Sequence, residues 1–168
     1  MISSTAAVTV ARPEVADGVA CWRLAAESKV LDVNSRYAYV LWCRDFAATS
    51  VVAKSGDVVI GFITGYRRPE QPSTLLVWQV AVDEQVRGLG IGGSMLDVLF
   101  DQVPDADRLE TTVTPDNVGS AALFSAFARR RDAPIERREL FGADVLGADH
   151  DPEILFRIGP INRGMMLT

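Results

Sequence analysis

The sequence is poor in the residues that bind metals or form disulfide frameworks. Its 168 residues include one histidine and two cysteines. Cys21 and Cys43 lack the close paired spacing of a zinc site, so we expect no metal. A chain of this length buries a sizeable core without disulfides, and we expect both cysteines to be buried free thiols on helices.

Long apolar runs and an excess of positive charge are also lacking. No stretch approaches the roughly 20 apolar residues of a membrane span, and the first residues lack a signal-peptide pattern. The 22 Asp and Glu residues outnumber the 17 Lys and Arg residues, giving a net charge of −5, and the basic run "RRRD" at 129–132 is short. We therefore expect a cytoplasmic protein that binds neither membrane nor nucleic acid.

What is present is typical of one globular domain, with 48% hydrophobic and 23% charged residues. We expect residues 1–168 to form a single α/β domain in which 1–7 are disordered and helices flank one mixed β-sheet. The composition predicts that strand 75–82 is buried on both faces, between a proline-rich loop at 67–74 and a glycine-rich loop. The expected strands are 8–10, 49–54, 58–66, 75–82, 108–114, 134–140 and 154–158; the expected helices are 13–28, 35–48, 92–103 and 116–131; and 141–153 is expected to be irregular.

The glycine-rich loop, "QVRGLGIGG" at 85–93, is typical of phosphate binding. It is not a P-loop, because no lysine follows the last glycine. It formally matches a dinucleotide fingerprint through Gly88, Gly90 and Gly93, with Glu110 as the acid, but "DEQVR" separates the strand from the first glycine. A turn that merely caps a helix is a further alternative.

A third interpretation accounts for the intervening residues. "QVRGLG", directly after the strand "VWQVAV", resembles the acyl-CoA-binding motif of the GNAT family of N-acetyltransferases. Glycines at 88, 90 and 92 let backbone N–H groups converge on a pyrophosphate, and the helix that begins there adds the positive end of its dipole. The resemblance implies a GNAT fold and acetyl-CoA as co-substrate. The residues implied in binding it are Val80, Ala81, Val82, Gln85, Arg87, Gly88, Gly90, Ile91, Gly92 and Asn117.

A second segment carries the same resemblance. "PDNVGSAALF" places Asn117, Ser120, Leu123 and Phe124 at the offsets usual in that family. Many members have a tyrosine in place of Phe124, as the acid that protonates the leaving thiolate. Phenylalanine has no hydroxyl, so we assign no general acid. We expect direct transfer in a ternary complex, because neither cysteine has a basic partner nearby in sequence to support an acetyl-cysteine.

Longer stretches of the sequence resemble one particular group of GNAT enzymes. "PEQPSTLLVWQVAV" and "LETTVTPDN" resemble the diaminobutyrate acetyltransferases of ectoine biosynthesis, and the similarity extends from about Val8 to Pro160. It implies acetylation of N4 of L-2,4-diaminobutyrate, a homodimer, and an acceptor site formed by Asp32, Trp78, His150 and Glu153. A mean hydropathy of +0.13 also favours a covered apolar surface. An acetyltransferase for another small amine and a non-catalytic acyl-CoA sensor are the alternatives.

The acceptor residues also have structural explanations. A substrate with two amines and one carboxylate needs acidic groups in two roles, which Asp32 and Glu153 can fill. Asp32 could instead cap its loop, Trp78 could be ordinary core, and His150 could lie in a solvated loop. Glu110 could act as a base, but we expect it to be a solvated strand carboxylate.

Overall fold

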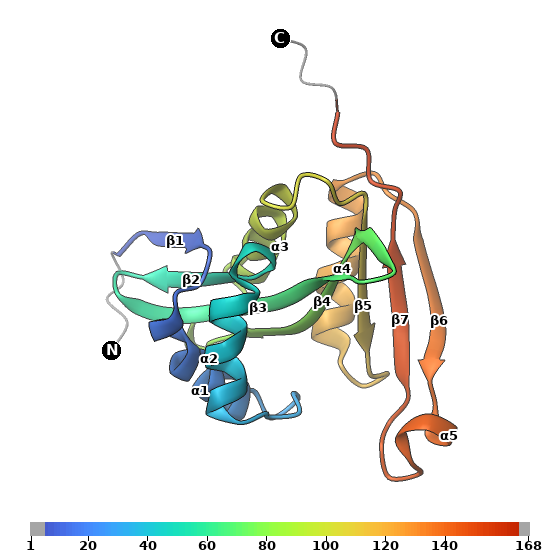
Figure 1. Cartoon of the computed structure of the whole chain (residues 1–168), viewed down its shortest axis with the longest axis horizontal. Helices are drawn as coiled ribbons and strands as arrows, with labels where there is room; N and C mark the ends of the chain where they lie inside the picture. Colours follow the sequence, from blue (N-terminus) through green and yellow to red (C-terminus); the bar gives the residue numbers. More distant parts are fainter. Residues whose placement is uncertain (1–5, 165–168) are drawn as a thin grey trace. The chain divides into compact units, whose positions relative to one another are not determined.

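The computed structural model describes residues 6–164 (Figure 1), so most of the expected disordered segment 1–7 lies outside the described residues. Seven strands form one mixed sheet in the order β1-β2-β3-β4-β5-β7-β6, in which β4 and β5 are parallel. The strands are β1 (Val8–Ala11), β2 (Val51–Ser55), β3 (Val58–Arg68), β4 (Gln71–Val82), β5 (Arg108–Val113), β6 (Ile135–Phe141) and β7 (Glu153–Ile158). The helices are η1 (Val15–Asp17), α1 (Gly18–Ser28), α2 (Arg36–Asp45), η2 (Ala47–Thr49), η3 (Glu84–Val86), α3 (Ile91–Asp101), α4 (Val118–Arg130) and α5 (Ala143–Leu146).

The chain divides into two compact units. The first contains the described residues up to Tyr66 together with Trp78–Pro104, and the second contains Arg67–Val77 and the described residues from Asp105 onward. Both β3 and β4 therefore contribute to each unit. The expectation of a single domain stays a prediction.

In the first unit, helices cover both faces of the sheet. Helices α1 and α2 pack on β2 and β3 around Phe62, which is 1% exposed. The neighbouring Gly61 faces the other way, and a Cβ there would lie 3.0 Å from the Met95 side chain of α3. Successive strand residues point to opposite faces, so α3 covers the side away from α1 and α2.

The helix ends in this unit follow from local sequence. Lys29 ends α1 in the left-handed conformation, with φ 61°. As expected, residues 29–34 form a break, and the Ser35 side chain accepts a hydrogen bond from Ala38 N at 3.2 Å to cap α2. Cys21 and Cys43 are buried free thiols on α1 and α2, as predicted.

The second unit contains an antiparallel arrangement of β5, β7 and β6 beside the first half of β4. The charged strand β6 pairs only with β7 among the described residues, which makes it an edge strand. On one face, the Arg137 guanidinium lies 4.7 Å from the Phe156 ring centroid and donates to Ser125 of α4 at 2.5 Å. That face is therefore covered by α4.

Several boundaries differ from the sequence-based expectation. The proline-rich loop shrinks to a turn at 69–70, because β3 and β4 continue almost to each other. Strand 75–82 is not buried on both faces; its residues alternate between buried and half-buried. Helix α2 ends at Asp45 and a 3₁₀ turn follows, and the segment 141–153 contains the short helix α5.

Candidate functional site

The glycine-rich loop has the backbone that its sequence predicts. Gly88 and Gly90 have positive φ angles of 81° and 78°, and Gly90 is the N-cap of α3. A Cβ at either glycine would have no atom within 4 Å, so the space above the loop is open. The first N–H groups of a helix have no partner within the helix, and the start of α3 is therefore suited to an anion.

A depression of about 480 Å³ adjoins this loop. Three of the residues predicted to bind the cofactor, Val82, Gln85 and Arg87, line it. The Arg87 Nε donates a hydrogen bond to the Val82 carbonyl at 3.3 Å, which folds this cation back toward the end of β4. The remaining lining residues are Leu24, Glu27, Ser28, Lys29, Asp83 and Glu84.

Lys29 is the basic residue among these six, none of which was predicted from the sequence. It places a second cation beside Arg87, because α1 ends next to the loop after β4. No sequence pattern links residue 29 to residue 87, so only the packing of α1 could have revealed it. The side chains of Ala81 and Ile91 are buried, which leaves only their backbone groups for contact with a ligand.

Asp32 lies in the break between α1 and α2 and is attached to the sheet. Its carbonyl accepts a hydrogen bond of 2.8 Å from Gln79 Nε2. The Oε1 atom of the same glutamine accepts a bond of 2.8 Å from the Tyr39 hydroxyl. Burial raises the pKa of Tyr39, so this hydroxyl stays protonated and donates. Neither Gln79 nor Tyr39 was predicted from the sequence.

Trp78 belongs to an aromatic cluster and is half-buried rather than fully enclosed. Its ring stacks on Trp42 at 4.5 Å between centroids and lies 6.5 Å from that of Tyr39. Trp42 is oriented by a hydrogen bond of 3.2 Å from its Nε1 to the Gly65 carbonyl. These ring contacts restrict the orientation of the Trp78 side chain and leave part of its surface accessible.

The second unit contains the other predicted residues. Asn117 is the N-cap of α4, and its Oδ1 accepts from Ser120 N at 3.2 Å. Phe124 lies in the core at 1% exposed. His150 lies in a turn, where its Nδ1 is 2.5 Å from the Asp151 carbonyl oxygen. Glu153 is the half-buried first residue of β7, not part of a loop, and pairs with Phe141.

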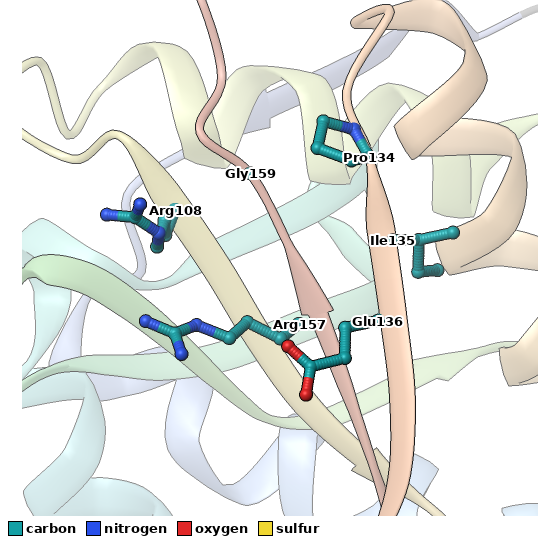
Figure 2. Close-up of a pocket in the computed structure, with 6 residues that line it drawn as sticks. All are labelled: Arg108, Pro134, Ile135, Glu136, Arg157 and Gly159. Carbon is teal, nitrogen blue, oxygen red and sulfur yellow. The ribbon is translucent and has the colours of Figure 1, made fainter.

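Glu110 was expected to be solvated, and this expectation is wrong. It is 5% exposed, with its carboxylate oxygens 3.6 Å from Arg68 Nη1 and 3.5 Å from Arg157 Nε. The carboxylate is buried because two guanidinium groups balance its charge. Figure 2 shows Arg157 beside a pocket of about 290 Å³ that Arg108 and Glu136 also line.

The predicted residues thus fall into two sets. Asp32, Trp78 and the glycine loop belong to the first unit, while Asn117, His150 and Glu153 belong to the second. Between residues 6 and 164, no cluster of three or more His, Cys, Asp or Glu residues could hold a metal ion. Over the same range, no helix has the length and apolar character needed to cross a membrane.

Comparisons with known proteins agree with the resemblance. Residues 19–128 match the model of the "Acetyltransferase (GNAT) family". An L-2,4-diaminobutyric acid acetyltransferase of Streptomyces coelicolor is 52% identical over 98% of this chain and 99% of that protein. One from Halalkalibacterium halodurans is 40% identical over 92% of this chain and 83% of its own length.

A solved structure is similar over almost the whole chain. It is the diaminobutyrate acetyltransferase EctA from Paenibacillus lautus, in complex with its substrate L-2,4-diaminobutyric acid and coenzyme A. The TM-score is 0.89 at 36% identity, over 95% of this chain and 99% of that one. The glycine loop, the mixed sheet and these relatives lead to one conclusion: the chain belongs to the GNAT acetyltransferase family and, within it, to the L-2,4-diaminobutyric acid acetyltransferases.

Proposed function

We propose that the protein transfers an acetyl group from acetyl-CoA to N4 of L-2,4-diaminobutyrate, a step of ectoine biosynthesis. The main support is the similarity to diaminobutyrate acetyltransferases along nearly the full length of both chains. The open glycine loop at the start of α3 supports the choice of co-substrate, because an acyl-CoA carries the pyrophosphate that such a loop binds.

The co-substrate is bound by the first unit in this proposal, with Asn117 as a further ligand. Backbone groups of residues 88–92 and the Arg87 guanidinium hold the pyrophosphate. The backbone of residues 80–82 binds the pantetheine and polarises the thioester carbonyl, which stabilises the oxyanion that develops during transfer. Lys29 adds positive charge beside the same depression.

The acceptor residues hold one ammonium group while the other amine reacts. Asp32 and Glu153 supply negative charge, and Trp78 and His150 border the acceptor. The N4 ammonium first gives a proton to water. The neutral N4 then attacks the thioester carbon, so that a C–N bond forms and the C–S bond breaks, and N4 gives its second proton to water. The leaving thiolate takes up one proton, from another group of the site or from water, because Phe124 has no hydroxyl to supply it.

Release of the CoA thiol tests the proposal directly. Acetyl-CoA is offered with diaminobutyrate, ornithine, lysine and polyamines, and NMR of the product identifies the acetylated nitrogen. Diaminobutyrate should be the preferred acceptor, with the acetyl group on N4. Binding of acetyl-CoA without thiol release for any amine would instead indicate an acyl-CoA sensor, and equal activity on ornithine would indicate a broader acetyltransferase.

The acidic residues are tested by changes that keep shape and remove charge. Asp32→Asn and Glu153→Gln should each lower kcat/KM for diaminobutyrate by about ten- to a hundredfold, because a charge-assisted hydrogen bond contributes about 1.5–3 kcal/mol. The KM for acetyl-CoA should stay constant. Asp57→Asn, in the exposed turn between β2 and β3, is the control and should change neither parameter.

We also propose a homodimer. Three exposed apolar side chains lie close together in sequence, Val30 (65%), Val33 (47%) and Tyr37 (70%), and such a group is often covered by a partner. Light scattering at micromolar concentration should give twice the chain mass of 18.3 kDa, and a value of one chain mass would contradict the proposal. A cytoplasmic location and folding as one domain stay predictions.

A further inference from the structure

We propose that Gln79 is a positioning residue that sets the orientation of Asp32 for the acceptor. The inference rests on the proposed function, and it assigns to Gln79 a role that acts through Asp32. Gln79 follows Trp78 on β4 and donates to the Asp32 carbonyl at 2.8 Å. Gln79 therefore connects two of the predicted acceptor residues: it is the chain neighbour of Trp78, and it is hydrogen-bonded to Asp32.

The glutamine is well suited to this role because its amide both accepts and donates. Its Oε1 accepts from the Tyr39 hydroxyl at 2.8 Å, and its Nε2 donates to Asp32. Gln79 is 4% exposed and Tyr39 is 1% exposed. A buried amide with both ends bonded has one favourable orientation, because turning it over would place its oxygen against the Asp32 carbonyl oxygen, and both are acceptors.

Other contacts fix the start of the loop, and the Asp32 carbonyl also accepts a longer hydrogen bond of 3.5 Å from Asn34 Nδ2. The Ser28 hydroxyl accepts from the backbone N–H groups of Val30 at 3.4 Å and Leu31 at 3.3 Å, which fixes the start of the loop. Leu31 packs against the core formed by α1, α2 and the sheet. The shorter bond of 2.8 Å from Gln79 orients the peptide unit between Asp32 and Val33, and the direction of the Asp32 side chain follows from that orientation.

A positioning role predicts a change in substrate affinity that stability alone does not explain. Gln79→Glu keeps the shape and still accepts from Tyr39, but an ionised carboxylate cannot donate to the Asp32 carbonyl. We expect the KM for diaminobutyrate to rise about tenfold, while kcat and the KM for acetyl-CoA change less than about threefold. Hydrogen exchange of the backbone at residues 30–35 should become faster.

Gln102→Glu is the matched control. Gln102 also donates its amide to backbone carbonyls, those of Ser50 at 2.8 Å and Ala48 at 3.2 Å, but it lies at the end of α3 away from the loop. Its replacement should lower the melting temperature without changing the KM for diaminobutyrate. An equal change of that KM in both variants would mean that Gln79 acts only through stability, and would overturn the inference.

A double variant covers the possibility that Gln79→Glu does not fold. Tyr39→Phe with Gln79→Met replaces both buried polar groups by apolar groups of similar shape, which is often close to neutral for stability. It should fold, show faster exchange at residues 30–35 and have the raised KM. A folded double variant with wild-type exchange and KM would overturn the inference. The exchange measurement needs no substrate, so it separates failure of this inference from failure of the proposed activity.

Discussion

The indole rings of Trp42 and Trp78 stack with centroids 4.5 Å apart and planes inclined by 30°. This contact joins α2 to β4 beside the loop that carries Asp32. One face of Trp78 is occupied by Trp42, so the direction of its accessible surface depends on that neighbour. The stacking on Trp42 thus sets an orientation of the Trp78 ring that its position on a β-strand alone does not determine.

Trp42→Leu should therefore weaken acceptor binding as well as stability. An aromatic pair contributes about 0.5–1.5 kcal/mol beyond its burial, so we expect the KM for diaminobutyrate to rise about two- to tenfold. Trp22→Leu is the control, since Trp22 is a half-buried tryptophan of α1 that lies under Arg36 and not against Trp78. Steady-state kinetics and thermal unfolding of both variants measure the two effects separately.

The role of the glycine loop is tested by substitutions at two glycines that both have positive φ. Gly90 has φ 78° and Gly56, in the turn between β2 and β3, has φ 61°; a Cβ at either would meet open space. Gly90→Val and Gly56→Val should both lower the melting temperature, because a branched side chain disfavours positive φ. Only Gly90→Val should raise the KM for acetyl-CoA. We expect a rise of about tenfold or more, because the substitution removes contacts to the phosphate.

Glu110→Gln should destabilise the protein. The substitution leaves Arg68 and Arg157 facing a neutral amide at residue 110, which is 5% exposed in the wild type. Removing one partner of a buried ion pair costs about 3–5 kcal/mol, and we expect the lower end because both arginines are about one-third exposed. Urea unfolding measures the loss, and unchanged stability would show that the two ion pairs contribute little. Glu136→Gln, on the exposed strand β6, is the control.

The two cysteines should resist modification in the folded protein. Cys21 and Cys43 are 1% and 3% exposed, and a hydrogen bond with Cys43 together with burial raises the pKa of Cys21. The same hydrogen bond lowers the pKa of Cys43, so the protection of Cys43 rests on its burial. Alkylating and disulfide reagents need an accessible thiolate. We expect no labelling by a chromogenic disulfide reagent near pH 8 and labelling of both thiols after unfolding. Rapid labelling of the native protein would show that α1 and α2 separate frequently.

The pair formed by Lys54 and Asp17 should make stability depend on pH in the alkaline range. Lys54 Nζ lies 2.9 Å from Asp17 Oδ1, and this bond raises the pKa of Lys54 above its ordinary value. A raised folded pKa means that the stabilisation is complete below about pH 10.4 and is lost as the pH rises through the folded pKa. The stability difference between wild type and Lys54→Met should shrink between about pH 9 and pH 12.

The sequence by itself determined the parts of this protein that depend on local rules. Glycines at 88 and 90 indicated a phosphate-binding loop at the start of a helix, and both have positive φ. A helix was expected from residue 35, and the Ser35 side chain caps α2. The strands expected at 49–54 and 58–66 correspond to β2 and β3, which pair on either side of a short turn. These features form within a few residues of each other, so their sequence signals are complete in a short window.

Only the tertiary structure decided which distant side chains meet. Gln79 contacts a loop 47 residues earlier in the chain, and no spacing in the sequence predicts that contact. The same holds for Lys29 beside Arg87 and for Glu110 between Arg68 and Arg157. Glu110 shows the physical reason: whether a strand carboxylate is solvated or buried depends on the charges that packing brings to it, and those charges come from other strands.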